Sequence, residues 1–291
     1  MTNERPENVW AATLPNGLRV RVLCKPDFQR SYAVLAACYG GADRRFRVGD
    51  TWTDTPAGVA HYLEHKLFDM PDGSDALTAL CGNGASPNAF TSANMTAYYF
   101  SCTDHFEENL RTLLRFVSTP YFTDASVAKE QGIIAQEIRM GDDDPNRAVW
   151  RNLMRCLMAR DGARDAVAGT VESIAQITPE ILYACTDAFY RPQNMVLAVA
   201  GNVTMDEVLA ACARADIPVK TGTVERLASA EGPDVAEPYR EFSMAVAKPL
   251  LGVGFKETPP AGDALKTEII CDMLTELICG SMTPLYRRLY D

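Results

Sequence analysis

Apolar and polar positions alternate in several short stretches of the chain, which predicts β-strands. Val9–Lys25 alternates on both sides of Asn16-Gly17, the residue pair typical of a tight hairpin turn. Ser31–Tyr39 is almost continuously apolar, as expected for a buried central strand. We predict further strands at Met95–Cys102 and Met195–Ala200. Residues 82–92 are expected to be a loop that enters an edge strand, because Pro87 cannot donate a hydrogen bond to a central ladder.

Between these strands the apolar residues recur at helical spacing. Helices are expected over residues 74–81, 106–117, 123–160 (two helices, broken at 141–145), 178–190 and 204–215. Residues 42–54 are polar and are expected to be irregular, and Asp142–Asp144 to be a solvated loop. Strands and helices do not alternate regularly. The sequence therefore predicts an α+β fold, with helices packed on a mostly antiparallel sheet.

Pro and Gly residues gather in 217–240, which we interpret as a linker. It separates an expected α+β domain, residues 1–216, from residues 241–291. That last segment has a strand-like run at 243–255, a helical pattern at about 261–279 and a short helical tail at 283–291. This order echoes the start of the chain, but the segment is too short for a second domain of the same size. We therefore expect it to be the beginning of a second, incomplete domain.

Charge and composition exclude several classes of function. The formal net charge of −10 and the pI near 4.9 leave no basic surface for nucleic acid or for an anionic membrane. Residues 1–10 lack the apolar core of a signal peptide, and no apolar run is long enough to span a membrane. Nine cysteines without a C-x-x-C pair favour reduced structural thiols over disulfides or a catalytic cysteine. These features together predict a soluble, cytoplasmic protein.

The strongest chemical signal is the stretch TPAGVAHYLEHKLFD, residues 55–69. Thr55 is a good helix cap and Pro56 suits a first helical position. On such a helix His61 and His65 lie one turn apart on one face, with Glu64 beside them. This H-x-x-E-H order inverts the common zinc-protease motif, in which two imidazoles bind zinc and the glutamate is a general base. The alternative is a helix that carries two histidines by chance, and a catalytic zinc needs a third ligand.

Glu130 and Glu137 are candidates for that third ligand. They are seven residues apart, which places them on one helical face two turns apart. Ile133, Ile134 and Ile138 are expected to bury this region, where an unpaired carboxylate would be costly. Glu137 would then find its partner in zinc, and Glu130 would orient a ligand from outside. A pair of exposed glutamates on an acidic helix is the alternative, and spacing does not decide between the two.

At these residues the chain resembles the pitrilysin/insulinase metallopeptidases, the inverzincins. The matching segments cover essentially the whole chain: GVAHYLEHKLF, NAFTS, AYYFS, PYF, the 130–137 stretch, GTVESI and FYRPQNMVLAVAGNV. The details are most similar to the bacterial cytosolic, processing-peptidase-like branch, which includes a member associated with modification of elongation factor P. The resemblance implies the metallopeptidase fold of that family, built from two related domains.

The resemblance also implies roles for individual residues. His61, His65 and Glu137 would be zinc ligands, Glu64 the general base and Glu130 the outer carboxylate. The edge strand with Asn88, Ala89 and Phe90 would bind an extended substrate by adding it as a strand. His105 has no counterpart in the family and is expected at the surface.

The expected function is that of a zinc endopeptidase, in which Glu64 activates a zinc-bound water to hydrolyse peptides or unfolded protein segments. The alternative is a non-catalytic subunit, or an assembly or modification factor, that keeps the peptidase fold. A purely structural zinc module fits least, since such sites usually have four protein ligands. In the family an Arg and a Tyr of the second domain, beyond a segment like LYRRLYD, help to bind substrate. The chain ends before that point, so we expect the remainder of a longer protein, or a homodimeric or heterodimeric peptidase-like partner, to supply them.

Overall fold

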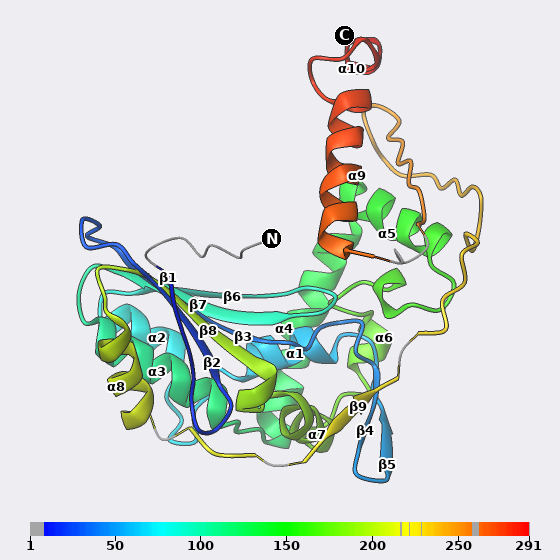
Figure 1. Cartoon of the computed structure of the whole chain (residues 1–291). Helices are drawn as coiled ribbons and strands as arrows, with labels where there is room; N and C mark the ends of the chain where they lie inside the picture. The colour runs from blue at the N-terminus through cyan, green and yellow to red at the C-terminus, as the bar shows by residue number, and fades with distance from the viewer. Residues whose placement is uncertain (1–8, 216, 221, 228, 258–261, 291) are drawn as a thin grey trace.

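The computed structural model describes residues 9–215, 217–220, 222–227, 229–257 and 262–290. Its centre is a six-stranded sheet in the order β1-β2-β8-β3-β7-β6 (Figure 1). The strands are β1 Val9–Thr13, β2 Arg19–Cys24, β3 Ser31–Ala37, β6 Ser86–Thr91, β7 Thr96–Cys102 and β8 Met195–Gly201. Among the described strands, only β2 and β8 pair in parallel. The predicted mostly antiparallel α+β fold is therefore confirmed.

The helices lie between and after these strands. They are α1 Val59–Lys66, α2 Ala76–Gly82, α3 Phe106–Ser118, α4 Asp124–Asp142, α5 Pro145–Leu157, α6 Val171–Ile174, α7 Pro179–Phe189, α8 Met205–Arg214, α9 Ala264–Cys279 and α10 Pro284–Tyr290, with short 3-10 turns η1 Gly162–Arg164 and η2 Pro192–Asn194. The helices predicted before residue 216 are thus confirmed to within a few residues. The break in 141–145 arises because Asp144 caps the first backbone N–H groups of α5.

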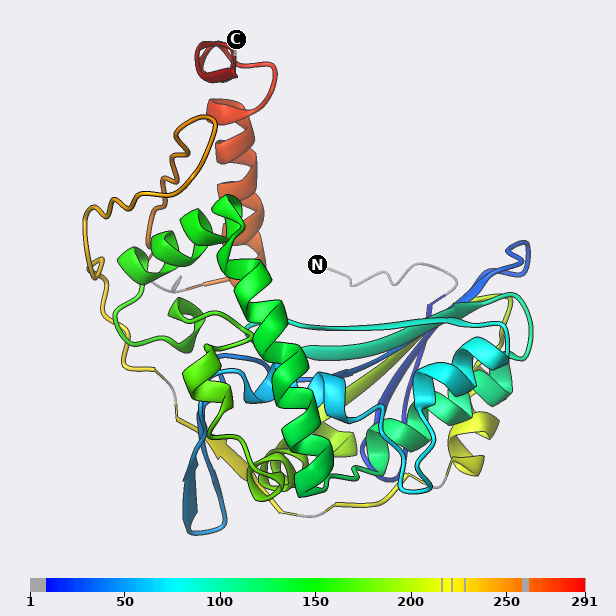
Figure 2. The ribbon, with the colours of Figure 1, turned by 180° about the vertical axis from the view of Figure 1, so that it is seen from behind.

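The sheet buries one face and leaves the other partly open. Along β3 and β8 every second residue is buried, with Leu35 and Leu197 almost fully inaccessible. Helices α1, α2, α3 and α8 contact the sheet, and seen from behind the long helix α4 crosses this layer beside α1 (Figure 2). The core therefore lies between the sheet and the helices that cover this face. None of the described helices has the length and apolar content that a membrane span needs.

The expectation of irregular structure in residues 42–54 was wrong. Arg45–Val48 (β4) and Thr51–Asp54 (β5) form an antiparallel hairpin. Gly49 takes a positive φ at its turn, and the guanidinium groups of Arg45 and Arg47 stack on Trp52. A third strand, β9 Val224–Arg226, joins β4 from within the predicted linker. The linker is therefore partly ordered against the first part of the chain.

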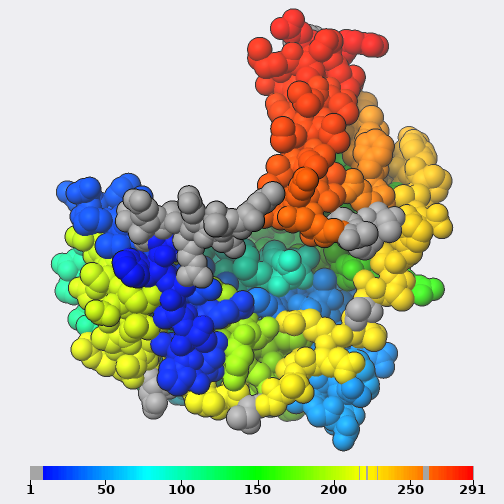
Figure 3. Space-filling model, in the orientation of Figure 1, coloured from blue at the N-terminus to red at the C-terminus, as the bar shows by residue number. Residues whose placement is uncertain are grey.

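The strand predicted at residues 243–255 was also wrong, since these residues form no strand and pair with none in the described parts of the chain. They lie against α5, where a methyl group added to Gly252 or Gly254 would meet Val149 or Leu157 at less than 3 Å. Beyond them α9 and α10 rise away from the sheet (Figure 3). The predictions for residues 1–8, for the helix start at 261 and for the last residue of the tail lie outside the described residues.

Candidate metal centre

Helix α1 begins later than its sequence suggested. Thr55 does not cap it: its buried hydroxyl donates to the carbonyl of Arg44 at 3.0 Å. The cap position is Gly58, whose φ of 99° favours glycine. A side chain at Gly58 would also collide with the carbonyl of Ala168, 2.6 Å from the place of its Cβ. This close contact fixes the start of α1 beside the 162–169 loop.

The structure brings His61, His65 and Glu137 together. One potential ligand atom from each lies within 4.8 Å of the others. Nε2 of His61 is 3.6 Å from Oε1 of Glu137, and Nε2 of His65 is 3.6 Å from Oε2 of the same carboxylate. Neighbouring ligands of a tetrahedral zinc with bonds near 2.1 Å are about 3.4 Å apart. The spacing and the donor types therefore fit zinc.

Helix α4 carries both predicted glutamates and packs against α1. The hydroxyl of Tyr62 donates to the carbonyl of Val127, which ties the two helices together. The predicted burial of this face holds for Ile134 and Ile138 but was wrong for Ile133, whose exposed fraction is 50%. The side chain of Glu137 is 44% exposed, because it points into the open space beside α1 rather than into the core.

Glu130 lies behind His65, on the side away from Glu137. Its Oε1 is 2.9 Å from Nδ1 of His65, so Nδ1–H donates and Nε2 keeps its lone pair toward Glu137. The hydrogen bond with His65 is the main cause that lowers the pKa of Glu130, and Lys66 and Lys129 add to it. Glu130 thus holds the tautomer and orientation that a metal-binding His65 needs.

The two histidines differ in their protonation. Burial, with the charge of His65, lowers the pKa of His61 to about 4, although Glu137 and Glu130 act in the opposite direction. The imidazole of His61 is therefore neutral near pH 7 and can offer its lone pair. Burial also lowers the pKa of His65, but the hydrogen bond to Glu130 and the charges of Glu137 and Glu64 outweigh it, so the net pKa is raised. A cation in the space between these groups would favour the neutral imidazole of His65.

Glu64 lies next to this cluster, and its Oε2 accepts a hydrogen bond from the hydroxyl of Thr91, at the end of β6. Burial raises the pKa of Glu64, while the Thr91 hydrogen bond and His65 lower it. The hydroxyl of Thr96 lies 3.5 Å from that of Thr91 and donates to the carbonyl of Tyr39 at 2.9 Å. Sequence reasoning missed Thr91. Its signal was the strand alternation, which turns Thr91 and Ala89 to the opposite face from Asn88 and Phe90.

The predicted substrate strand is an edge of the sheet. Within the described residues β6 pairs only with β7. Asn88 and Phe90 are exposed, and Ala89 is half-buried against the core. The side-chain oxygen of Asn88 accepts a hydrogen bond from the N–H of Ala89 at 2.8 Å. β6 contacts α1, so this edge lies beside the histidines.

The remaining candidates lie apart from the centre. His105 is exposed, as predicted, and stands in the left-handed region at φ 52° before α3. All nine cysteines are free thiols, and none lines the cavity next to the histidines.

Comparison with known proteins identifies the family. The family model "Insulinase (Peptidase family M16)" matches residues 51–171, and "Peptidase M16 inactive domain" matches residues 176–291. A Bacillus subtilis protein named as an uncharacterized zinc protease, YmfH, is 38% identical over 98% of this chain and 68% of its own length. The chain belongs to the M16 peptidase family.

Other M16 proteins support the same placement. A Mycobacterium leprae protein, also named as an uncharacterized zinc protease, is 31% identical over 71% of this chain and 45% of its own length. The crystal structure of a putative M16-like peptidase from Alicyclobacillus acidocaldarius matches with a TM-score of 0.77 and 39% identity, over 81% of this chain and 56% of that one. The periplasmic protease PqqL from Escherichia coli, at 22% identity and a TM-score of 0.64, shares the fold. This M16 chain thus spans about half to two thirds of the length of these closer relatives.

Proposed function

We propose that this M16 chain is the zinc-binding part of an endopeptidase that hydrolyses peptides or unfolded protein segments. The observation that carries the proposal is the convergence of His61, His65 and Glu137 beside the carboxylate of Glu64. Three protein ligands are typical of catalytic rather than structural zinc. The relatives named as zinc proteases support the same metal.

Each residue then has a role that its contacts support. His61, His65 and Glu137 hold the metal, and Glu130 fixes the tautomer of His65. When bound, zinc supplies a Lewis acid that activates water and polarises a peptide carbonyl. Glu64 takes a proton from the attacking water and delivers it to the leaving amine. The Thr91 hydroxyl donates to Oε2 of Glu64 and so helps to orient the carboxylate for this transfer.

The substrate would bind along the open edge of β6. Asn88, Ala89 and Phe90 offer backbone groups to an extended peptide, which would pair there as an added strand. The hydrogen bond from the N–H of Ala89 to Asn88 would be exchanged for one to the substrate. Strand pairing of this kind requires an extended chain, which favours peptides and unfolded segments over folded proteins.

The proposal also covers the domain division of the chain, its partner and its cellular compartment. We propose the division into a zinc-binding domain (1–216), a linker (217–240) and the beginning of a related domain (241–291). A homodimeric or heterodimeric peptidase-like partner, or further chain, would complete the substrate site. Nine free thiols favour a reducing compartment, and we propose the cytoplasm. The acidic charge supports neither a nucleic acid nor a membrane as partner.

Metal analysis and peptide cleavage test this function together. We expect about one zinc per chain in the wild type and at least about 10-fold weaker zinc binding in Glu137→Gln. Glu64→Gln should keep its zinc and lose turnover of an internally quenched peptide, assayed alone and with a candidate partner chain. A wild type that binds no zinc after reconstitution, or a Glu64→Gln variant as active as the wild type, would contradict the proposal.

A further inference from the structure

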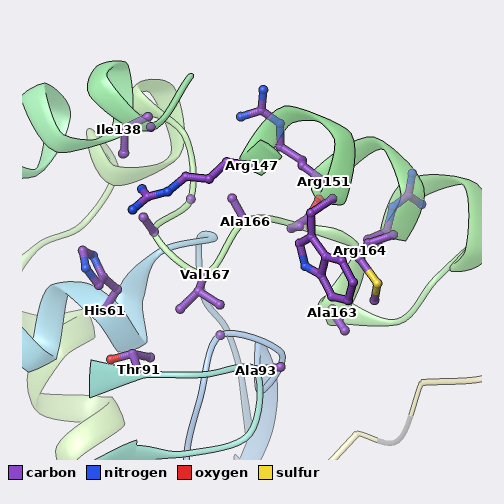
Figure 4. Close-up of a pocket in the computed structure, with 18 of the residues that line it drawn as sticks. His61, Thr91, Ala93, Ile138, Arg147, Arg151, Ala163, Arg164, Ala166 and Val167 are labelled. Carbon is purple, nitrogen blue, oxygen red and sulfur yellow. The ribbon is translucent and has the colours of Figure 1, made fainter. Parts of the chain in front are cut away.

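A cavity of about 740 Å³ opens next to the candidate metal centre. His61, Thr91 and Glu137 line one end of it. The rest is enclosed by the end of α4, by α5 and by the loop 162–169, which contributes several alanines and Val167 (Figure 4). Trp150 of α5 lines the cavity and is 64% exposed, a large apolar surface for a surface helix. The cavity is thus mostly apolar and has the size of a subsite for one or two substrate residues.

Most charged groups that line this cavity are already paired. Arg151 forms an ion pair with Asp142. Asp165 is paired with Arg44 at 2.6 Å, and Arg164 donates to the carbonyl of Ala159. Each of these side chains is thus oriented by a partner within the protein.

Arg147 is held less firmly. Its side chain makes no hydrogen bond within the part of the chain that the structure describes, and its ion pair joins Nε to Asp144 at 3.7 Å, beyond hydrogen-bond distance. Figure 4 shows the side chain extending from α5 toward the His61 end of the cavity, whereas Arg151 and Arg164 turn away from that end.

The guanidinium of Arg147 lies against Gly141. A Cβ on Gly141 would lie 2.9 Å from a terminal nitrogen of Arg147, so the guanidinium rests on the bare backbone of α4. Gly141 is four residues after Glu137, one helical turn along the same face. The guanidinium therefore lies against the helical turn that follows the candidate metal ligand Glu137, roughly 5–6 Å further along the axis of α4.

We propose that Arg147 makes this cavity a subsite for a carboxylate-bearing residue of the substrate, next to the bond that is cut. A guanidinium binds a carboxylate through two parallel hydrogen bonds, and Trp150 can cover the aliphatic part of the same residue. The carboxylate is that of a Glu or Asp side chain or of a peptide C-terminus. This inference rests on the proposed peptidase function and adds to it a preference for acidic substrates.

Mapping of cleavage sites tests the preference. Zinc-loaded wild type, Arg147→Gln and Arg147→Glu are incubated with reduced, alkylated casein, and the products are sequenced by mass spectrometry. We expect acidic residues to be enriched at one position beside the cut in the wild type, the enrichment to be lost in Arg147→Gln, and Lys or Arg to replace it in Arg147→Glu. Arg139→Glu, an exposed α4 residue outside the cavity, is the matched control and should keep the wild-type pattern. Cleavage without an acidic preference, or with one unchanged in Arg147→Glu, overturns the inference while the peptidase function stands.

Binding decides the inference even if the chain cleaves nothing, an outcome that would count against the peptidase function alone. Three fluorescein-labelled nonapeptides are titrated into zinc-loaded Glu64→Gln protein with Arg147 either intact or changed to Glu. The first has a central Glu and an amidated end, the second a central Gln and an amidated end, and the third a central Gln and a free C-terminus. With Arg147 intact we expect the first or the third to bind about 10-fold more tightly than the second, which also identifies the source of the carboxylate. Equal affinity of all three peptides, or a difference that survives Arg147→Glu, overturns the inference.

Discussion

The hydroxyl of Thr91 donates to Oε2 of Glu64 from the end of the edge strand, so the candidate general base is held by the same strand that would bind the substrate. Thr91 is in turn next to Thr96, whose hydroxyl is anchored on the carbonyl of Tyr39. The orientation of Glu64 therefore depends on the register of β6 and β7, in which Thr91 lies opposite Thr96.

We predict that Thr91→Val reduces kcat about 10-fold or more, because a hydrogen bond to a charged group is lost in a partly buried place. The shape of the side chain is kept, so zinc content and KM should change little. Thr91→Ser restores the hydroxyl and should recover most of the activity. Steady-state kinetics with a quenched peptide give kcat and KM for each variant, and elemental analysis gives its zinc content. Equal loss in the Val and Ser variants would show that only packing matters at this position.

Replacing Glu130 by Ala should weaken zinc binding about 10- to 100-fold, since the hydrogen bond that orients His65 is removed. Glu130→Gln can still accept from Nδ1–H and should cost less. Titration with a competing chelator measures both affinities. Glu180→Ala, which changes an exposed glutamate on α7, is the control with the same loss of charge. Equal zinc affinity of wild type and Glu130→Ala would remove the role assigned to Glu130.

Removal of zinc should destabilise the fold around α1 and α4. Glu64 and Glu137 lie close enough for their negative charges to repel each other when no cation is bound. At a free zinc concentration 100-fold above the dissociation constant, binding adds about 2.7 kcal/mol to the free energy of unfolding. We therefore expect a lower melting temperature after chelation, restored by zinc. Glu137→Gln should show little response to the chelator. A wild type whose melting temperature ignores the chelator would contradict the site.

Away from the candidate metal centre, Glu231 should stabilise the loop 159–161 in a pH-dependent way. Its carboxylate accepts hydrogen bonds from the N–H groups of Ala159, Arg160 and Asp161 and from Lys256. The bond to Lys256 is the main cause that lowers the pKa of Glu231 to about 2. The stabilisation from this carboxylate should be complete above its ordinary pKa of about 4.3 and be lost as the pH falls through its folded pKa of about 2.

Glu231→Ala should therefore raise the hydrogen-exchange rates of the amides of 159–161 several-fold at pH 7. The difference between variant and wild type should shrink as the pH falls from about 4.5 to 2, because the stabilisation by Glu231 fades in the wild type over this range. Glu225→Ala removes an exposed partner of Arg47 and should leave these amides unchanged. Unchanged exchange in Glu231→Ala would show that other contacts hold this loop.

The helical half of the site could be predicted because it depends on a fixed period. His61, Glu64 and His65 share one helix, and Glu130 and Glu137 share another, so spacing alone places them on two faces. The contact between these two faces depends on the packing of α1 against α4. Residue spacing within one helix carries no information about that packing. Only the family resemblance indicated that the two faces meet.

The wrong predictions for residues 42–54 and 243–255 have local physical reasons. In residues 45–54 the alternation of Arg45, Phe46, Arg47 and Val48 before a Gly-Asp turn was a valid hairpin signal, hidden by a polar composition. Residues 243–255 have the composition of a strand, but a strand needs a hydrogen-bonding neighbour, and here the segment packs on α5 instead. The cavity with Arg147 could not be foreseen, since its walls come from α4, α5 and a loop whose packing is set by glycines.

The place of β8 in the sheet has a consequence for the order of folding. It lies between β2 and β3, although it follows both of them far along the chain. During translation, all of the residues from His61 to Glu137 are synthesised before Met195–Gly201. Until then the β1–β2 hairpin has no strand to join it to the rest of the sheet, and the long-range pairing that follows is slow. The nascent chain thus contains every candidate zinc ligand before β8 is available to complete the six-stranded sheet.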